Sequence, residues 1–337
     1  MTTESRELRS GSVPEVPRVD SPSPKPAVAA PASGSETSRS VRRSRHEAWA
    51  AYLFLTPWFV GLFLITIGPI VASLYLSFTD YSLLEEAKWI GADNYSKMFG
   101  ADQRFWTSLK VTTIYVVVSV PLQLAFALAL ALLLDRGLRG LSFYRSIYYL
   151  PSLLGGSVAI AILWRKIFGA EGLINAGLAV FGIQGSSYVN DPDTALGTLI
   201  LLHVWTFGAP MVIFLAGLRQ IPSSYYEAAA IDGAGTLQRF RSITLPLLTP
   251  IIFFNLVLEV IKSFQSFTQS FIVSNGSGGP NDSTLFYTLY LYLNGFKHYD
   301  MGYAAALAWV LVLIIAGLTG VNFLASKYWV FYGDDSK

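Results

Sequence analysis

The sequence predicts an all-α membrane protein with six transmembrane helices and with both ends of the chain in the cytoplasm. The composition indicates the class, because 53% of the 337 residues are hydrophobic, only 14% are charged, and the mean hydropathy is +0.46. Six apolar segments, each near the ~20 residues that cross a bilayer, give the number of helices. The division of lysine and arginine between the short loops gives the orientation.

Residues 1–45 precede the first apolar segment and are rich in proline, serine and alanine. Such a stretch cannot bury enough apolar surface to fold, so we expect a disordered tail. It lacks the short apolar region of a secretory signal peptide. The tail ends in a basic cluster that favours a cytoplasmic N-terminus and can contact anionic lipid headgroups: Arg42, Arg43 and Arg45.

The six apolar segments form one expected membrane domain over residues 46–330, followed by a short cytoplasmic tail at residues 331–337. In order they are Ala48–Phe78, Leu109–Leu134, Phe143–Phe168, Ala195–Leu218, Leu247–Val273 and Ala304–Ala325. Several contain internal proline or glycine, among them Pro151 and the pair Gly155–Gly156 in the third. This content favours a moving, cavity-forming bundle or reflects the ordinary composition of membrane helices, and both interpretations stay open.

Two short loops are expected on the cytoplasmic side, at Asp135–Ser142 and Arg219–Pro246, and they are rich in arginine. The outer segments mix basic residues with many acidic ones, so the charge bias supports both termini inside. These outer segments are Thr79–Ser108, Gly169–Thr194 and Ser274–Tyr303.

The stretch Glu227–Pro246 is mostly small and polar and lies between the fourth and fifth apolar segments. A Ser-x-x-Glu spacing predicts that Ser224 caps a short helix, and the glycines at 233 and 235 predict its end and a sharp turn. Thr236 is expected to cap a second short helix, which Pro246 would end. A compact helix–turn–helix with a smooth alanine face is suited to docking into a groove on another protein.

This stretch resembles the EAA loop of the permease subunits of binding-protein-dependent ABC importers. The family pattern E-A-A, D-G-A, F, I-x-L-P is matched at Glu227, Ala228, Ala229, Asp232, Gly233, Ala234, Phe240, Ile243, Leu245 and Pro246. From about Ala51 to the end of the sixth segment the chain is also similar to the carbohydrate branch of this family, the maltose- and glycerol-3-phosphate-type subunits. The large outer insertion of the maltose-type subunit is missing, because the outer segments are short.

The resemblance implies a division of labour in a bacterial cytoplasmic membrane. This chain would form half of a sugar pathway with a second, different permease subunit, and an extracytoplasmic binding protein would deliver the sugar. Two cytoplasmic ATPase subunits would dock on the loops and hold the ATP and Mg²⁺, so this chain would be no enzyme and would hold no cofactor. The resemblance assigns ATPase coupling to Glu227, Ala228, Ala229, Asp232, Gly233 and Ala234, with the glutamate pairing with a basic residue and Gly233 acting as the hinge.

The sequence itself lacks the ingredients of an enzyme. It has no cysteine, no phosphate-binding glycine loop, no Gly-x-Ser-x-Gly elbow and no His-Glu-x-x-His zinc pattern. We therefore expect no catalytic residue and no metal site, and the ATPase must be a separate chain. The net charge of +2 is too small to indicate a nucleic-acid partner.

Polar residues recur at steps of three or four along the fifth segment, beside a bulky apolar face. A polar stripe inside a membrane faces protein or water rather than lipid. Sugars bind to hydroxyl, amide and carboxylate groups and to aromatic rings, so we predict a substrate pathway lined by His203, Trp205, Asn255, Glu259, Ser263 and Ser266. The other interpretation is a hydrogen-bonded helix–helix interface, with Glu259 and Lys262 paired for structural reasons.

An ion-coupled secondary transporter that uses Glu259 and Lys262 is the main rival function, because it also explains charges at membrane depth. It does not explain the alanine–glycine loop, and the sequence shows no internal repeat of the kind found in many such transporters.

Overall fold

The computed structural model describes residues 40–136, 140–183 and 185–331, which are mostly helical. The chain divides into two compact units, Met1–Phe63 and Leu64–Lys337. Most of the predicted N-terminal tail and residues 332–337 of the predicted C-terminal tail lie outside the described residues.

The first unit contains the helix α1 (Ser40–Gly61), with Pro57 inside it. This helix already includes residues 40–45, which the sequence places in the tail, so the helical backbone starts earlier than expected. A π-helical stretch at Leu62–Ile67 leads on to α2 (Gly68–Leu76). Residues Ala51–Leu76 are long and apolar enough to cross a membrane.

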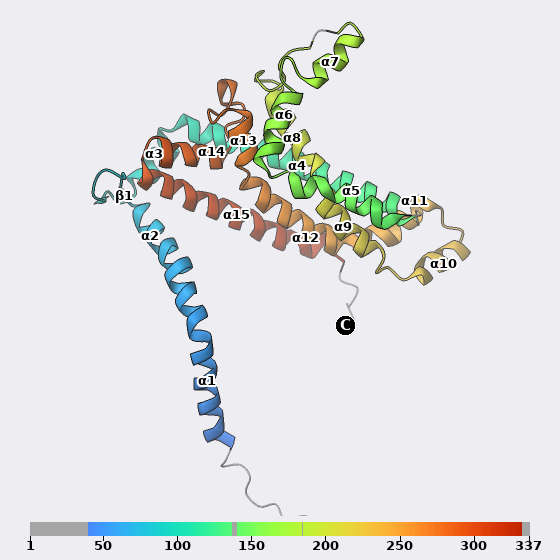
Figure 1. Cartoon of the computed structure of the whole chain (residues 1–337). Helices are drawn as coiled ribbons and strands as arrows, with labels where there is room; N and C mark the ends of the chain where they lie inside the picture. The colour runs from blue at the N-terminus through green and yellow to red at the C-terminus, as the bar shows by residue number, and fades with distance from the viewer. Residues whose placement is uncertain (1–39, 137–139, 184, 332–337) are drawn as a thin grey trace, which may run out of the picture. The chain divides into compact units, whose positions relative to one another are not determined.

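In the second unit, long apolar helices and two bent helix pairs form a bundle (Figure 1). The long helices are α4 (Gln103–Asp135), α12 (Leu245–Phe264) and α15 (Met301–Trp329). The bent pairs are α5 (Leu141–Leu154) with α6 (Val158–Ile167), and α8 (Ala195–Trp205) with α9 (Gly208–Leu218). The described residues thus hold four candidate spans, or up to six if each bent pair is one span, and the expected number of six stays a prediction.

Short elements occupy the predicted outer segments. Strands β1 (Thr79–Asp80) and β2 (Lys88–Trp89) pair antiparallel with Thr79 opposite Trp89. The helical elements here are α3 (Asp93–Gly100), α7 (Leu173–Val180), a 3₁₀ turn (Pro280–Asp282), α14 (Tyr287–Tyr292) and a π-helical turn (Leu293–Lys297). A further short helix, α13 (Thr268–Val273), lies at the end of the predicted fifth apolar segment.

Three apolar segments that the sequence presents as continuous are interrupted. The third bends by 94° after α5, and the fourth bends by 41° after α8. The prediction of one helix over Leu247–Val273 is wrong, because α12 ends at Phe264 and α13 begins only at Thr268. Pro151 and the pair Gly155–Gly156 weaken the third segment, since proline removes a backbone donor and glycine favours other conformations.

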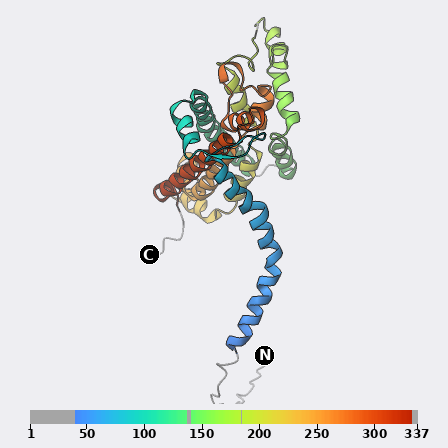
Figure 2. The same ribbon diagram turned by 90° about the vertical axis from the view of Figure 1, so that its left-hand side faces the viewer.

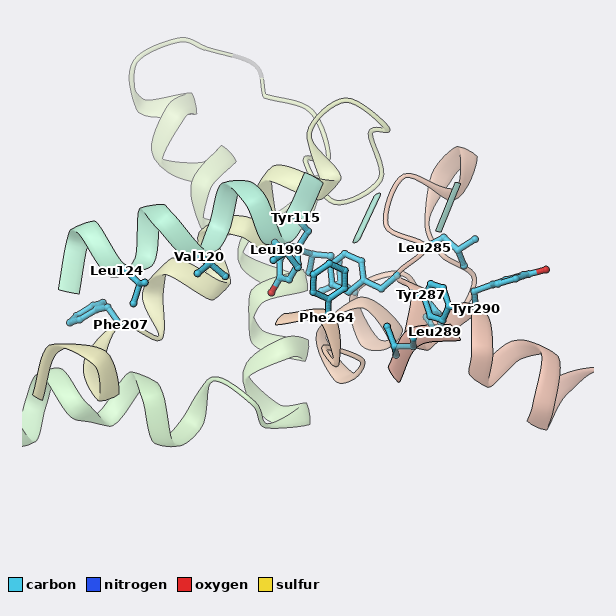
Figure 3. Packing of buried hydrophobic residues seen from close by; sticks show 14 of the residues in the cluster. Tyr115, Val120, Leu124, Leu199, Phe207, Phe264, Leu285, Tyr287, Leu289 and Tyr290 are labelled. Atoms are coloured by element: carbon cyan, nitrogen blue, oxygen red, sulfur yellow. The ribbon is translucent and has the colours of Figure 1, made fainter. Parts of the chain in front are cut away.

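The hydrophobic core of the second unit forms where α4 packs against α8, α9, α12 and α14 (Figure 3). Tyr115, Val120 and Leu124 of α4 face Leu199, Phe207 and Phe264 there. Helices α5 and α9 approach so closely at Gly208 that an added Cβ would lie 2.3 Å from the Tyr148 carbonyl oxygen. The core therefore fixes the positions of the three interrupted segments relative to one another.

Candidate functional site

A polar cavity of about 360 Å³ lies where the three interrupted segments meet α4. Each break contributes residues to its wall. The lining comprises Tyr115 and Gln123 of α4, Ser152, Gly155 and Gly156 at the α5–α6 bend, Leu202, His203, Thr206 and Ala209 at the α8–α9 bend, and Glu259, Lys262 and residues 265–269 around the end of α12.

Side chains satisfy the backbone groups that the α8–α9 bend sets free. The Ser152 hydroxyl donates to the Thr206 carbonyl oxygen at 2.7 Å and accepts from the Ala209 amide at 2.8 Å. The Gln123 amide nitrogen donates to the same carbonyl oxygen at 3.2 Å and to the Thr206 hydroxyl at 3.1 Å. Unpaired backbone groups are costly away from water, so these bonds allow the bend to exist at membrane depth.

The α5–α6 bend is joined to the end of α12 in the same way. The Gln269 amide nitrogen donates to the Gly155 carbonyl oxygen at 3.2 Å, and the Ser266 hydroxyl donates to the Gln269 side-chain oxygen at 3.1 Å. Gly155 also packs directly on Thr206, because an added Cβ would lie 2.1 Å from the threonine methyl group. The three breaks therefore form one hydrogen-bonded unit around the cavity.

One carboxylate and one ammonium group meet at the cavity wall. Lys262 Nζ lies 2.9 Å from Glu259 Oε1, and the two side chains are 60% and 7% exposed. On the other side, His203 Nε2 lies 4.0 Å from Glu259 Oε2 and 3.3 Å from the Ser263 hydroxyl. A buried carboxylate needs a partner, and Lys262 supplies one to Glu259 while its own side chain stays open to the cavity.

The structure brings together four of the six residues predicted for the substrate pathway. His203, Glu259 and Ser266 line the cavity, and Ser263 lies directly behind His203. Ser266 does so from the linker beyond α12 and not from the helix that carries Glu259, which corrects the idea of a single stripe. Asn255 and Trp205 are not among the lining residues. The Asn255 amide donates to the Ile251 carbonyl within α12, and the Trp205 ring packs 5.9 Å from that of Trp164.

The lining residues that the sequence did not predict include Tyr115, Gln123, Ser152 and Thr206. Gln123 offered a signal, because it is a lone amide inside the apolar second segment and polar groups at such depth mark functional sites. Ser152 follows Pro151, so its position beside a weak point of the helix was a second signal.

The predicted docking loop forms two helices, α10 (Ser223–Ile231) and α11 (Thr236–Arg239). Gly233 makes the turn between them with φ +77°, as expected for a residue just after a helix. Both predicted caps are wrong, because Ser224 and Thr236 lie inside the helices and neither helix has a side-chain cap. The helices begin after Pro222 and Gly235. Both residues have an extended backbone, and neither helix has a side chain that accepts from its first amides.

The prediction that Pro246 ends the second helix is also wrong. A π-helical turn at Phe240–Thr244 joins α11 to α12, and Pro246 is the second residue of α12. Proline is tolerated in a first turn, where no intrahelical bond needs its missing amide. The loop is therefore rigidly continuous with a helix that reaches the cavity.

The predicted coupling residues lie on the exposed side of the loop. Glu227, Ala228, Asp232 and Gly233 are exposed, and Ala229 and Ala234 are half-buried. The Ala234 carbonyl accepts from Arg239 Nε at 2.8 Å, and the Ala234 amide donates to the Ala229 carbonyl at 2.9 Å, so the turn is held in shape. Next to these polar residues Ile231 is 88% exposed, which leaves an apolar point on the same surface.

A second polar cluster joins the start of α4 to α14 and α15. Asp102 caps α4 by accepting from the Phe105 amide at 3.0 Å, and its other oxygen accepts from the hydroxyls of Tyr290 and Tyr303. Burial alone would raise the pKa of Asp102, but these hydrogen bonds outweigh it and hold the pKa below the usual 3.8. Nearby, Arg104 makes a two-pronged ion pair with Asp282 at 2.7 and 2.9 Å. This end of the molecule is thus fixed by charged hydrogen bonds.

Comparison with known proteins shows the family to which this chain belongs. The family of binding-protein-dependent transport system inner membrane components matches residues 111–327. The chain is 51% identical over 300 residues to the probable ABC transporter permease protein YesP of Bacillus subtilis, covering 89% of this chain and 97% of that protein. It is 33% identical to the lactose transport system permease protein LacF of Rhizobium radiobacter, covering 86% and 98%.

The fold agrees with that of solved transporters. A bacterial alginate ABC transporter, solved in complex with an alginate pentasaccharide-bound periplasmic protein, contains a chain that matches with a TM-score of 0.73 at 20% identity. The match covers 85% of this chain and 96% of that one. At this identity the likeness concerns the fold alone.

Proposed function

Because the chain belongs to the inner membrane components of binding-protein-dependent transport systems, we propose that it forms half of the pathway of an ATP-driven sugar importer. The family expected from the Glu227–Pro246 stretch is confirmed, and the chain is a multi-pass membrane protein. Relatives at about one-third identity are named for lactose and for arabinooligosaccharide transport, which supports a sugar as the substrate.

The polar cavity is the observation that carries the proposal. Its volume of about 360 Å³ falls in the range of small-molecule sites. Amide, hydroxyl and charged groups surround it, and the rings of Tyr115 and Phe267 contribute aromatic surface. Sugar hydroxyls both donate and accept hydrogen bonds, and sugar C–H faces pack on rings, so this mixture fits a sugar better than an apolar solute.

Gln123 is well placed as a contact in this cavity. Its side-chain nitrogen donates to Thr206, whereas its side-chain oxygen is buried and has no hydrogen-bond partner among the described residues. A buried acceptor without a partner is unfavourable, so a hydroxyl donated by a solute would stabilise it. His203, Glu259, Ser263 and Ser266 complete the proposed pathway.

The exposed loop is proposed to couple this pathway to ATP hydrolysis on separate subunits. Glu227 makes no ion pair with the described residues, and we assign it to a basic residue on a cytoplasmic ATPase. ATP and Mg²⁺ would be held by that ATPase, two copies of which would serve this chain and a second permease subunit. Since the loop continues through α12 to Glu259 and Lys262, a movement of the docked ATPase would reach the cavity directly.

The orientation follows from the same assignment. With the Glu227 loop in the cytoplasm of a bacterial cell, α3 and α14 face the outside, where an extracytoplasmic binding protein would deliver the sugar. Both chain termini would lie in the cytoplasm. The family supports an importer over the rival secondary transporter, because binding-protein-dependent transport systems take their substrate from a binding protein.

A pull-down in mild detergent tests the proposal. The tagged chain should bring down an ATPase and a second permease chain, and a sugar-loaded binding protein should stimulate the ATP hydrolysis of the purified complex. A variant with Glu227→Lys should lose the ATPase, whereas Gln238→Lys, an exposed change in α11, should retain it. If the chain is isolated alone and uptake follows an ion gradient, the proposal is wrong.

A further inference from the structure

The helix α7 and the turn after it, residues 172–183, form an apolar arm that extends from the end of α6 (Figures 1 and 2). Large apolar side chains on this arm are open to the surroundings. Leu173 is 70% exposed, Val180 82%, Phe181 81% and Ile183 53%. Soluble surfaces rarely carry such a continuous apolar patch, so the arm requires an apolar environment.

The arm has a defined shape of its own. The Asn175 side-chain nitrogen donates to the carbonyl oxygens of Gly169, Ala170 and Ser186, at 3.2, 2.8 and 2.8 Å. Gly182 ends the helix with φ +75°, a conformation that favours glycine. The helix and the returning chain are thus held together, and the apolar side chains are presented by a fixed scaffold.

The arm carries no charge. Residues 172–190 contain no charged side chain, whereas Glu171 precedes them and Asp191 and Asp193 follow. An apolar stretch of about 10–14 residues without charges has the length of a segment that lies in the membrane interface or enters the membrane and leaves it again.

The residues just before the arm include side chains that suit a membrane interface. Arg165 and Lys166 occupy the last turn of α6, and Phe168 follows it. Basic side chains near the end of a membrane helix reach the level of the lipid headgroups, so α7 begins next to that level.

The exposed positions cover α7 on every side except that of Asn175 and Leu178, which indicates what covers it. Leu173, Ile174 and Val180 are exposed, as are the small residues between them, and only Asn175 and Leu178 are half-buried. A groove on a partner protein covers one face of a helix, whereas lipid chains cover every face. We propose that α7 and its turn are immersed in the lipid of the outer leaflet and anchor the bend between α6 and α8 there.

Because the arm carries no charge, the contact is with lipid chains and shows no preference for anionic headgroups. The choice of the outer leaflet rests on the proposed function, because the orientation is assigned from the Glu227 loop. The immersion of α7 in lipid depends neither on the sugar nor on the ATPase.

The absence of cysteine from the sequence makes the test direct. Single cysteines at Leu173→Cys and Phe181→Cys are spin-labelled in the full chain, which is reconstituted with its co-purifying subunits into phosphatidylcholine vesicles. Collisions with oxygen, which partitions into lipid, are compared with collisions with a water-soluble nickel chelate. Both labels should favour oxygen, and adding phosphatidylglycerol to the vesicles should leave the ratio unchanged.

Leu84→Cys is the matched control. Leu84 is 87% exposed, similar to Phe181, but Glu85 and Glu86 follow it directly, so its label should favour the nickel chelate. Three results would overturn the proposal. Labels at 173 and 181 that favour nickel place the arm in water, labels shielded from both reagents place it under a protein, and a lipid signal at only one of the two sites indicates a one-sided partner.

Discussion

Glu259 shows how a single carboxylate is accommodated within the bundle. Its side chain is 7% exposed, with Lys262 on one oxygen and His203 near the other. Removing one partner of a buried pair leaves an uncompensated charge, so the role of the pair is best tested by changing Glu259 itself without changing its shape. Asn255 lies one helical turn earlier and is equally buried, but it does not line the cavity.

The substitution Glu259→Gln should lower sugar uptake by about tenfold or more, since a charge-assisted hydrogen bond contributes ~1.5–3 kcal/mol. Asn255→Leu should reduce uptake much less at equal amounts of assembled complex. Uptake of labelled sugar by cells, normalised to the complex in the membrane, measures both. An equal loss in the two variants would mean that α12 is a packing interface and not part of the pathway.

For single residues, the sequence predicted which polar side chains share a helix face better than it predicted their contacts with other segments. Periodicity identified Glu259 and Ser263, because three- and four-residue steps share one face of a helix. Periodicity did not identify Gln123 and Ser152, because both bind the carbonyl of Thr206, which a bend brings to them from another segment. A pattern within one segment cannot predict a contact between two segments.

Among the elements, the turn between α10 and α11 requires glycine because of its backbone conformation and not because a side chain would collide with neighbouring atoms. Gly233 has φ +77°, yet an added Cβ would contact nothing within 4 Å. Gly235 has equally open surroundings but φ −72°, a value that any residue adopts. The sequence predicted the glycine turn correctly and misplaced the caps, since chain direction at helix ends depends on neighbours that propensity does not include.

Replacing Gly233 with valine should therefore destabilise the turn by about 1–2 kcal/mol, the cost of a left-handed conformation for a residue with a side chain. Uptake should fall and ATP hydrolysis should become uncoupled from the sugar-loaded binding protein. Gly233→Asn should retain most of the activity, because asparagine tolerates this conformation, and Gly235→Ala should be neutral. Normal coupling in the valine variant would contradict the docking role of the turn.

The start of α4 offers a pH-dependent element. The pKa of Asp102 is lowered by hydrogen bonds that form only in the folded chain, so the ionised form stabilises the fold above the unfolded pKa of about 3.9. That contribution is lost as the pH falls through the lower, folded pKa. The cluster should therefore hold throughout the neutral and mildly acidic range.

Thermal inactivation in detergent should confirm this behaviour. This cluster should change the midpoint temperature of the wild-type chain little between pH 8 and pH 5. At pH values below 3.8 the midpoint temperature should fall. Asp102→Asn should lower the midpoint at neutral pH and flatten the acid drop. Asp93→Asn, at the exposed start of α3, serves as the control. An acid drop of the same size in both variants would assign it to other groups.

For the molecule as a whole, family and approximate spans could be read from the sequence, but the broken core could not. The six apolar segments and the EAA spacing are local signals, whereas the bends depend on side chains from other helices that pair with freed backbone groups. Gln269 does this at the 94° bend after α5, and Ser152 and Gln123 do it at the 41° bend after α8. The weak points at Pro151 and Gly155 were visible, and the partners that stabilise the bend were not. The packing of α5 on α9 then joins the cavity to the loop, because α9 leads directly to α10.

This connection can be tested at Gly208. An alanine there would place its Cβ 2.3 Å from the Tyr148 carbonyl oxygen and 2.7 Å from the Tyr149 Cα, so α5 and α9 would have to separate. Gly208→Ala should lower the thermal midpoint by an amount equivalent to about 1–3 kcal/mol and reduce uptake. Gly197→Ala, at an open position of α8, should be neutral or slightly stabilising. Unchanged behaviour of the Gly208 variant would show that the contact is not required.

The bends around the cavity are held by hydrogen bonds to main-chain carbonyl groups, among them those of Gly155 and Thr206. Point mutations replace side chains and leave carbonyl groups where they are. A protein of this design can therefore acquire a new substrate preference by exchanging Lys262, Gln265 or Thr268 while the supporting frame is inherited unchanged. The same division gives an engineer a short set of positions at which to begin a search for altered transport.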